Sequence, residues 1–254
     1  MVRQNLRVKS AGTMIQVIDA IKTLDNPTLS EIAKHVAIPK STAHDHLTTL
    51  TKLELIVSTQ SGYRIGARFL EYGGYARKNM RVYRVARPIV ENLAAETGEH
   101  SNLGIEEHGR AVFLYKAEGE DAVTIDTHPG MRVPLHTTAM GKAIMAHRPR
   151  TEVEEIINKH GLTKVNENTI TDRETLFEEF ETIREQGYAI DNGERVERMR
   201  CVAVPIIGEE ENVIAAVSVS GPMNRMNNER MKNDLPQRVK SAANVIEVNL
   251  KYSE

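Results

Sequence analysis

The chain has 254 residues and is 40 % hydrophobic, so it can bury the core of one large domain or of two modest ones. Its single cysteine, Cys201, excludes an internal disulfide framework, and no apolar run is long enough to span a bilayer. The first residues also lack the apolar segment of a secretory signal. We therefore expect a soluble, cytoplasmic protein without a membrane partner.

The net charge of −2 divides unevenly along the chain. Residues 1–70 hold nine basic and five acidic side chains, whereas the remainder holds 24 basic and 30 acidic ones. A polyanion such as nucleic acid would be attracted to the N-terminal end only. Chance asymmetry in a small window is the alternative, so the charge alone does not decide the function.

Residues 28–50 have the pattern of two short amphipathic helices joined by a tight turn, and an apolar helical stripe precedes them. Thr28 and Glu31 form the sequence pattern of a capping box at the start of the first of these helices. Pro39 presets the backbone for the next helix, which we expect over residues 40–52. This is the sequence form of a helix-turn-helix, whose second helix lies in the DNA major groove.

One side of the helix expected over residues 40–52 is apolar, and the other carries short polar side chains. Hydroxyl and imidazole groups suit base edges and phosphates, and the free N–H groups of a first helical turn favour phosphate. A solvated face is the alternative, although such faces usually carry more Glu and Lys. We therefore expect this helix pair to contact DNA. The candidate residues are Thr28, Ser30, Lys40, Ser41, Thr42, His44, Asp45 and Thr48.

Two short strands are expected next, over residues 55–58 and 63–66, around a polar turn that contains glycine. A hairpin directly after a recognition helix is the wing of a winged helix. Tyr63, Arg64 and Arg68 complete the candidate DNA contacts, with the two arginines beside the sugar-phosphate backbone. Arg64 is also typical of an ordinary surface charge, and that alternative stays open.

The rest of the chain mixes helical and strand-like segments, which indicates an α+β sheet with flanking helices. A helical linker is expected over residues 69–78. Further helices are expected over 79–97, 140–147, 151–160, 172–186 and 227–251, the fourth of them beginning at a capping box formed by Thr171 and Glu174. Strands are expected over 100–107, 111–118, 122–127, 188–191, 201–207 and 213–220.

Five segments, in this order, resemble the isocitrate lyase regulator (IclR) family of transcription factors, and most of all its archaeal members. The segments are PKSTAHDHL, YRIGARFLEYG, PLHTTAMGKAIMA, GYAIDNGERVERMRCVAVPI and AAVSVSGPMNRM. The resemblance covers nearly the whole chain. It implies an N-terminal winged helix-turn-helix joined by a helical linker to a GAF-like effector-binding domain. The expected divisions are an N-terminal arm at 1–9, the DNA-binding domain at 10–70, and the linker helix with the effector domain at 71–254.

The resemblance also implies a homodimer or homotetramer on palindromic, double-stranded operator DNA, controlled by a small organic or aromatic acid. We expect no enzyme activity, no cofactor and no metal. In the family, the effector lies against one face of the central sheet. The residues at the corresponding positions are Ile125, Thr138, Ala139, Met140, Gly141, Asp191, Met199, Cys201, Ser218 and Ser220.

The residue types agree with such a pocket in two places. Exposed N–H groups at the start of the helix at Ala139 would suit a carboxylate. Ser218 and Ser220 are two apart on an expected strand, so both hydroxyls face the same side. Cys201, taken alone, is more typical of a small buried apolar residue.

Two positions depart from the family pattern. Asp45 stands where many members carry arginine. A carboxylate repels phosphate but can accept from cytosine N4, so the operator sequence cannot be transferred from relatives. Arg198 replaces a small glycine that is common in the family, and we expect it to change the shape of the pocket.

Three other classes of function are less well supported. An enzyme would use Cys201 as nucleophile with His136 or His100 as base, but the spacing does not favour that pairing. A metal site is weakly indicated, because His44 and His46 diverge on one helix and the remaining histidines are scattered. A pure protein-interaction module would show no salt-sensitive binding to DNA.

Overall fold

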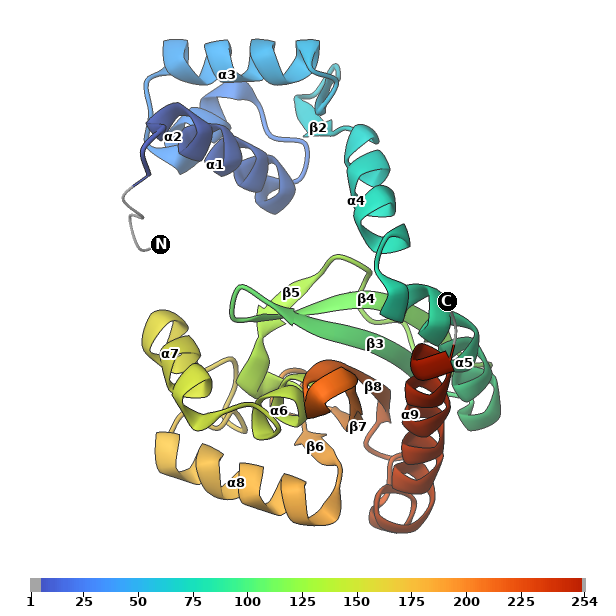
Figure 1. The fold of residues 1–254 in the computed structure, drawn as a ribbon. Helices are drawn as coiled ribbons and strands as arrows, with labels where there is room; N and C mark the ends of the chain where they lie inside the picture. The colour runs from blue at the N-terminus through green and yellow to red at the C-terminus, as the bar shows by residue number, and fades with distance from the viewer. Residues whose placement is uncertain (1–5, 253–254) are drawn as a thin grey trace. The chain divides into compact units, whose positions relative to one another are not determined.

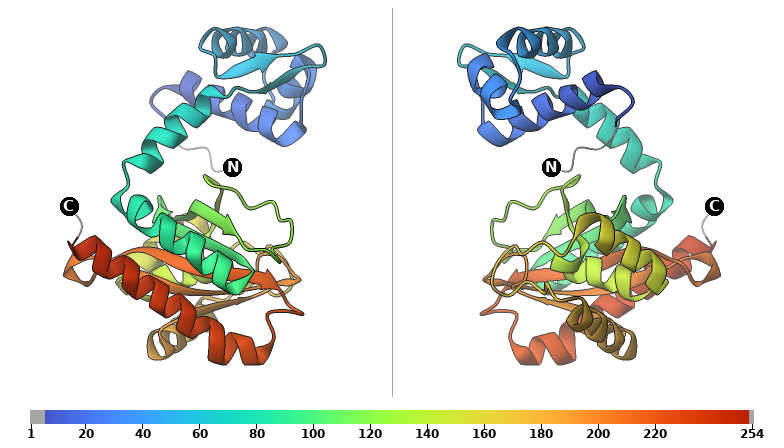
Figure 2. Two further views of the ribbon diagram at one scale, coloured as in Figure 1. Left: turned by 90° about the vertical axis from the view of Figure 1, so that its right-hand side faces the viewer. Right: turned by 90° about the vertical axis from the view of Figure 1, so that its left-hand side faces the viewer.

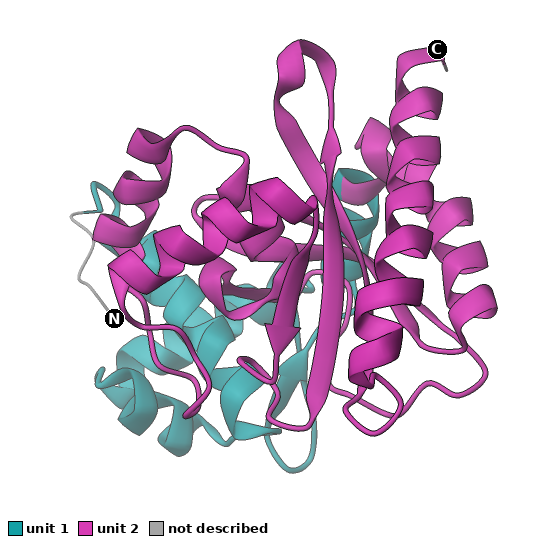
Figure 3. Ribbon diagram, turned by 90° about the horizontal axis from the view of Figure 1, so that it is seen from below, with its two compact units in different colours: residues 1–76 teal, residues 77–254 magenta. Residues whose placement is uncertain are grey.

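The computed structural model describes residues 6–252 and divides into two compact units, residues 1–76 and residues 77–254 (Figure 3). Residues 1–5 of the expected N-terminal arm and residues 253–254 lie outside the described part of the chain. Among the described residues, the longest apolar helical stretches fall short of what crossing a membrane requires.

The first unit has three helices followed by a hairpin (Figure 1). Its elements are α1 (Lys9–Leu24), α2 (Leu29–Val36), α3 (Lys40–Lys52), β1 (Ile56–Ser58) and β2 (Tyr63–Ile65). The expected capping box is present at the start of α2, where Glu31 Oε2 accepts from the Thr28 backbone N–H at 2.8 Å. The left-handed Ala37 ends α2, and Pro39 directly precedes α3. The helix-turn-helix and the wing are confirmed.

Buried apolar residues from all parts of this unit form its core. They are Val17, Ala20, Ile21, Ile32, Leu47, Leu50 and Ile56. The two strands of the wing pair antiparallel, with Ile56 opposite Ile65. The wing is also tied to the start of α2, because the Tyr63 N–H donates to the Pro27 carbonyl at 3.0 Å and a Cβ at Gly62 would collide with that carbonyl. The hairpin is therefore packed and held in place.

The linker forms α4 (Arg68–Lys78), as expected from the sequence, and α5 (Arg81–Thr97) follows it. The second unit is built on a six-stranded sheet in which neighbouring strands are antiparallel. In spatial order the strands are β5 (Arg132–Pro134), β4 (Arg110–Glu118), β3 (His100–Glu107), β8 (Val213–Pro222), β7 (Met199–Ile207) and β6 (Ala189–Asn192).

Helices cover both faces of this sheet, and the two views of Figure 2 turn first one set and then the other toward the viewer. Helices α5 and α9 (Leu235–Tyr252) pack on one face. The other face is covered by α6 (Ala139–Ala146), with α7 (Arg150–His160) and α8 (Arg173–Gln186) completing that core. Successive side chains of a strand point to opposite faces of the sheet, so each strand contributes to both cores. Val202 faces the α5–α9 side, whereas Ala203 faces the α6 side. The α+β class is confirmed.

The strand expected over residues 122–127 is wrong. This segment is an irregular loop, although its side chains alternate in the manner of a strand. It pairs with no strand of the sheet, and the Val123 carbonyl instead bonds to His100 Nε2 at 2.5 Å. The Val123 carbonyl thus bonds to a side chain and not to a neighbouring strand.

Two helix starts also differ from expectation. The cap of α8 is Asp172 rather than Thr171, because Asp172 Oδ1 accepts the Thr175 N–H at 2.8 Å. The last helix, expected over 227–251, contains a π-helical turn at Arg230–Asp234 before α9.

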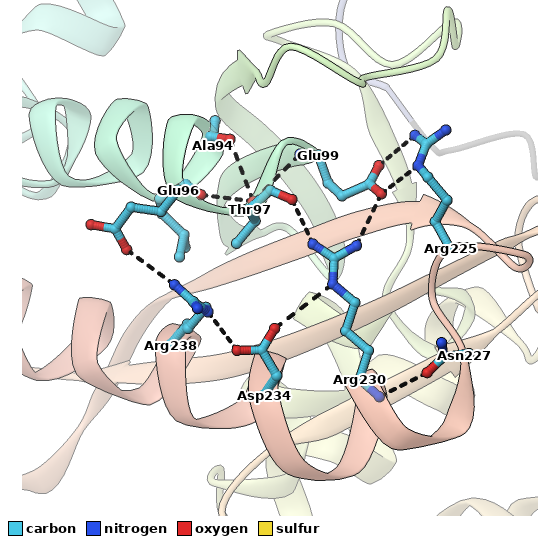
Figure 4. A network of polar contacts seen from close by, with 10 residues as sticks. Ala94, Glu96, Thr97, Glu99, Arg225, Asn227, Arg230, Asp234 and Arg238 are labelled. Carbon is cyan, nitrogen blue, oxygen red and sulfur yellow. Dashed lines mark hydrogen bonds and ion pairs between the residues drawn. The ribbon is translucent and has the colours of Figure 1, made fainter.

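A polar network anchors that π-helical turn to the end of α5 (Figure 4). Glu99 is almost fully buried and accepts from Arg225 at 2.7 and 2.8 Å, and from Arg230 at 3.3 Å. Arg230 also donates to the Thr97 carbonyl at 2.5 Å. The buried carboxylate is thus bound on both oxygens, which fixes the start of the last helix against the sheet.

Candidate functional site

The solvent-facing side of α3 carries the polar residues expected there. Ala43, Leu47 and Leu50 are buried in the core. The exposed candidates are Lys40, Ser41, His44, Asp45 and Thr48 on α3, together with Thr28 and Ser30 at the start of α2, whereas Thr42 is half-buried. These side chains are available to a partner, and α3 has the geometry of a recognition helix.

Asp45 is the acidic residue on this face. Its carboxylate lies 3.8 Å from His44 Nδ1, and both side chains are well exposed, so solvent screens the pair. The Asp45 backbone carbonyl accepts from the Thr49 hydroxyl at 2.8 Å. Asp45 therefore has a firmly placed backbone and a carboxylate that faces solvent.

The three candidates in and after the wing differ in their surroundings. Arg64 is exposed on β2, and its Nη1 donates to the Ile65 carbonyl at 3.2 Å. Tyr63 is half-buried and packs against the core of the unit. Arg68 is half-buried and donates to the Leu53 carbonyl at 2.6 Å, which ties α4 to the end of α3. Tyr63 and Arg68 therefore have structural roles, whereas Arg64 is free to meet a phosphate.

The second unit contains a partly open cavity on the α6 side of its sheet, lined by both polar and apolar side chains. Its volume is about 40 Å³. A buried water needs roughly 10–15 Å³ on this scale, so the cavity holds a few waters or a small molecule. The lining residues are Asn102, Phe113, Ile125, Thr127, Thr138, Met140, Asp191, Arg195, Val196, Met199, Cys201, Ser218 and Ser220.

Eight of the ten sequence-predicted pocket residues come together around this cavity. Ala139 and Gly141 do not line it. The hydroxyl of Thr138 caps α6 by accepting the Gly141 N–H at 3.0 Å, so that N–H is not open to a carboxylate. Gly141 instead allows close packing, because a Cβ there would collide with the Leu135 backbone.

Five lining residues were missed by the sequence reasoning: Asn102, Phe113, Thr127, Arg195 and Val196. Arg198, which stands where a small glycine is common in the family, is exposed and is not among the residues that line the cavity. The basic residue that reaches the cavity stands three positions earlier in the same loop. Asn102 lies opposite Ser218 in the register of β3 and β8, so the pairing of these two strands brings it to the cavity. No local pattern marks the loop residues.

Burial favours the protonated forms of two acidic groups in the cavity, the Asp191 carboxyl and the Cys201 thiol. Burial raises the pKa of the Asp191 carboxyl to about 7, with a further contribution from nearby Glu194. Burial likewise raises the pKa of the Cys201 thiol to about 12, with a further contribution from Asp191. Near neutral pH the thiol is therefore protonated and poorly suited to nucleophilic attack.

A buried ion pair supports the cavity from behind. Lys142 on α6 is 1 % exposed, and its Nζ donates to Glu194 at 2.6 Å and to Glu179 at 3.0 Å. Burial acts to lower the pKa of Lys142, but the two carboxylates outweigh it and raise that pKa. The Glu194 N–H donates to Asp191 Oδ1 at 2.7 Å. Lys142 thus positions the cavity loop through Glu194.

The geometry gives the enzyme and metal readings no support. His136 Nε2 bonds to the Thr163 carbonyl at 3.1 Å and His100 Nε2 to the Val123 carbonyl, and neither histidine is among the residues that line the cavity with Cys201. No cluster of three or more metal-binding side chains occurs between residues 6 and 252.

A winged helix with a polar recognition helix, combined with a second domain that contains a cavity, is the architecture of a ligand-responsive transcriptional regulator. The chain matches two family models, "IclR helix-turn-helix domain" over residues 14–59 and "Bacterial transcriptional regulator IclR C-terminal" over residues 75–248. The chain belongs to the IclR family of transcriptional regulators. Members of this family are regulators and not enzymes.

Named relatives span the full chain. The chain is 34 % identical over 248 residues to a probable HTH-type transcriptional regulator ArcR of Halobacterium salinarum, covering 96 % of this chain and 94 % of the relative. That relative is archaeal, as the sequence suggested. The chain is also 29 % identical over 250 residues to the regulator KdgR of Escherichia coli, covering 96 % of this chain and 95 % of that relative.

Solved structures share the architecture. A Thermotoga maritima IclR is 28 % identical with a TM-score of 0.75, covering 96 % of this chain and 98 % of that one. An IclR homologue of Microbacterium hydrocarbonoxydans, solved in complex with 4-hydroxybenzoate, is 26 % identical with a TM-score of 0.78, covering 96 % and 100 %.

Proposed function

We propose that this regulator binds a palindromic operator through α3 and the wing, and that a small organic acid in the cavity controls this binding. The observation that carries the proposal is a partly open cavity with polar groups among its lining, where eight of the residues singled out in the sequence meet from β6, β7, β8, the start of α6 and the loop before β5. A cavity lined by several convergent polar groups is what a small-molecule site requires. The 4-hydroxybenzoate complex of the related structure supports an acid as ligand.

On the DNA side, the first-turn residues Lys40 and Ser41 and the wing residue Arg64 would meet phosphates. His44, Asp45 and Thr48 would face base edges in the major groove. Their exposure, together with a buried opposite face of α3, supports this assignment. The domains would be residues 10–70 for DNA binding and 71–254 for the linker helix and effector binding.

The active species would be a homodimer or homotetramer in the cytoplasm. Large apolar side chains are exposed on α4, with Leu70 at 77 % and Tyr75 at 75 %. Unpaired apolar side chains on one helix favour association with a second copy. A two-fold dimer would explain a palindromic operator, because each half-site then meets an identical winged helix.

The test is an operator-release experiment. The operator would be selected from a random duplex library by the full-length protein, and binding would be followed by fluorescence anisotropy. Short organic and aromatic acids that raise the unfolding temperature would then be added. We expect at least one such acid to change operator affinity tenfold or more. Binding of acids without any change in operator affinity would contradict the proposal, and so would DNA binding that is insensitive to salt.

A further inference from the structure

Arg195 provides the cavity with a positive charge. It is the one basic side chain among the lining residues in the described part of the chain, and it is 15 % exposed. Its Nη1 donates to Thr127 Oγ1 at 3.0 Å, and its guanidinium carbon lies 5.6 Å from the centre of the Phe113 ring. The nearby carboxylate of Asp126 is 3.6 Å away and 76 % exposed, so water screens it strongly. An anion in the cavity would give the guanidinium a desolvated partner.

The loop that carries Arg195 is held in place without any ligand. On one side of Arg195, the Glu194 side chain binds Lys142, and the Thr169 hydroxyl donates to the Glu194 carbonyl at 2.8 Å. Asn166 Nδ2 donates to the Gly193 carbonyl at 2.9 Å. Because these contacts fix the backbone beforehand, binding to Arg195 would cost little ordering of the protein.

Asn102 presents a second recognition group. It is 2 % exposed, and its Nδ2 donates to Ser218 at 3.4 Å and to Ser220 at 3.3 Å. Its Oδ1 is buried and has no hydrogen-bond partner within residues 6–252. Buried acceptors are normally satisfied, so this atom indicates a donor supplied by a ligand. A hydroxyl suits the position because it can donate to Oδ1 and accept from a neighbouring serine.

Asp191 limits where the anionic group of a ligand can lie in the cavity. It lines the cavity from the edge strand β6, whereas the Phe113 ring beside Arg195 lies on β4, toward the opposite edge of the same sheet face. The guanidinium of Arg195 is near enough to Asp191 to act against the burial that raises the pKa of that carboxyl. A second carboxylate beside Asp191 would be repelled or would have to be protonated. The ligand's anionic group therefore belongs beside Arg195. The modest cavity volume favours a small ligand.

We propose that Arg195 and Asn102 determine effector specificity by reading a short hydroxy acid at two points, the carboxylate at Arg195 and the hydroxyl at Asn102. This inference rests on the proposed function of the cavity as the effector site. It assigns the choice of ligand to two residues outside the set that the sequence indicated.

The test measures binding of a probe panel to the full-length protein by isothermal titration calorimetry. The panel contains glycolate, lactate, glycerate and 3-hydroxybutyrate, each beside its amide and beside the acid that lacks the hydroxyl. We expect at least one hydroxy acid to bind at least tenfold more tightly than either matched compound. A panel in which no hydroxy acid shows this double preference overturns the inference.

Variants separate the two contacts. Arg195→Gln should weaken the acid tenfold or more and the amide less than threefold, whereas Arg195→Lys should keep part of the preference for the acid. Asn102→Leu should bind the hydroxy acid no better than its deoxy partner. Arg198→Gln is the matched control, since Arg198 is exposed in the same loop, and it should bind like the wild type. Thermal unfolding would verify that each variant is folded.

The outcomes distinguish this inference from the proposed function. If Arg195→Gln and Arg198→Gln have equal effects on binding, the specificity assignment is wrong, while acid-controlled operator binding can still be observed with the wild type. If hydroxy acids bind through Arg195 but leave operator affinity unchanged, the recognition holds and the proposed control of DNA binding fails.

Discussion

Helix α3 and the cavity of the second unit use polar side chains in opposite ways. On α3 the polar residues are exposed, and the core beneath them is complete without them. In the cavity, Asn102, Asp191 and Ser218 are buried; Asn102 donates to Ser218 across two strands, and Asp191 accepts from the Glu194 N–H in the loop after β6. Substitutions on α3 should therefore change DNA binding at little cost in stability. Substitutions around the cavity should change ligand binding and stability together.

The largest expected effect lies behind the cavity. Lys142→Ala leaves the carboxylates of Glu194 and Glu179 without their buried cation, and we expect the free energy of unfolding to fall by about 3–5 kcal/mol. The control is Lys164→Ala, which removes an exposed pair with Glu167 and should cost less than about 1 kcal/mol. Urea unfolding of both variants gives the comparison. Equal losses would show that burial does not distinguish the two pairs.

The next effect depends on pH and involves Asp191. Its pKa rises on folding from an ordinary value of 3.8 to about 7, so between pH 4 and 7 the folded state holds a proton that the unfolded state has released. Stability from this group therefore falls as the pH rises through that window and is fully lost above it. Asp191→Asn removes the effect and keeps an acceptor for the Glu194 N–H.

We thus expect Asp191→Asn to be more stable than the wild type at pH 8, by up to about 4 kcal/mol at 1.4 kcal/mol per pKa unit. The two proteins should converge toward pH 4. Denaturant unfolding across this pH range tests the prediction, with Asp19→Asn as a control at an exposed position. A wild-type profile that is parallel to that of Asp191→Asn would contradict it.

A smaller effect is expected at Asp45, and it should concern base choice alone. If the exposed carboxylate accepts from cytosine N4, Asp45→Asn should change discrimination at one base pair of each half-site by about 1–3 kcal/mol. Protein stability should stay unchanged, because Asp45 makes no contact with the core. Selection of duplexes from a random library by both proteins provides the measurement. An identical consensus would remove Asp45 from base readout.

The smallest effect is expected at Arg64. As a phosphate contact, it should add the same increment to every duplex, so Arg64→Ala should weaken specific and non-specific binding severalfold alike. The slope of the logarithm of affinity against the logarithm of salt concentration should fall by about 1. Lys22→Ala on α1 is the control within the same unit. An altered base preference with normal non-specific affinity would assign Arg64 a different role.

The two regions also differ in how far their residues could be predicted from the sequence. The face of α3 follows from helical periodicity within thirteen residues, and its bounds were predicted correctly. Strand alternation likewise predicted that Ser218 and Ser220 face the same side of their strand, and both line the cavity. The family pattern added Asp191 and Thr138, which periodicity alone would not bring together.

The missed residues depend on contacts between distant segments. Thr127 lies in a segment with strand-like alternation, and only the three-dimensional structure shows that this segment is a loop outside the sheet. Arg195 lies in a loop that has neither helical nor strand periodicity, three residues before Arg198, the arginine that the sequence reasoning singled out. Lys142 has the composition of a surface residue, and its burial depends on two carboxylates 37 and 52 positions away.

The central claim is that the cavity controls operator binding, and the double variant Ser218→Ala, Ser220→Ala tests it most directly. Both hydroxyls accept from Asn102, so their loss disrupts the polar side of the cavity and leaves α3 unaltered. Operator affinity should be measured by anisotropy with and without an acid that releases the wild type. We predict normal operator binding by the variant and no response to that acid. Loss of operator binding with normal acid binding would contradict the account.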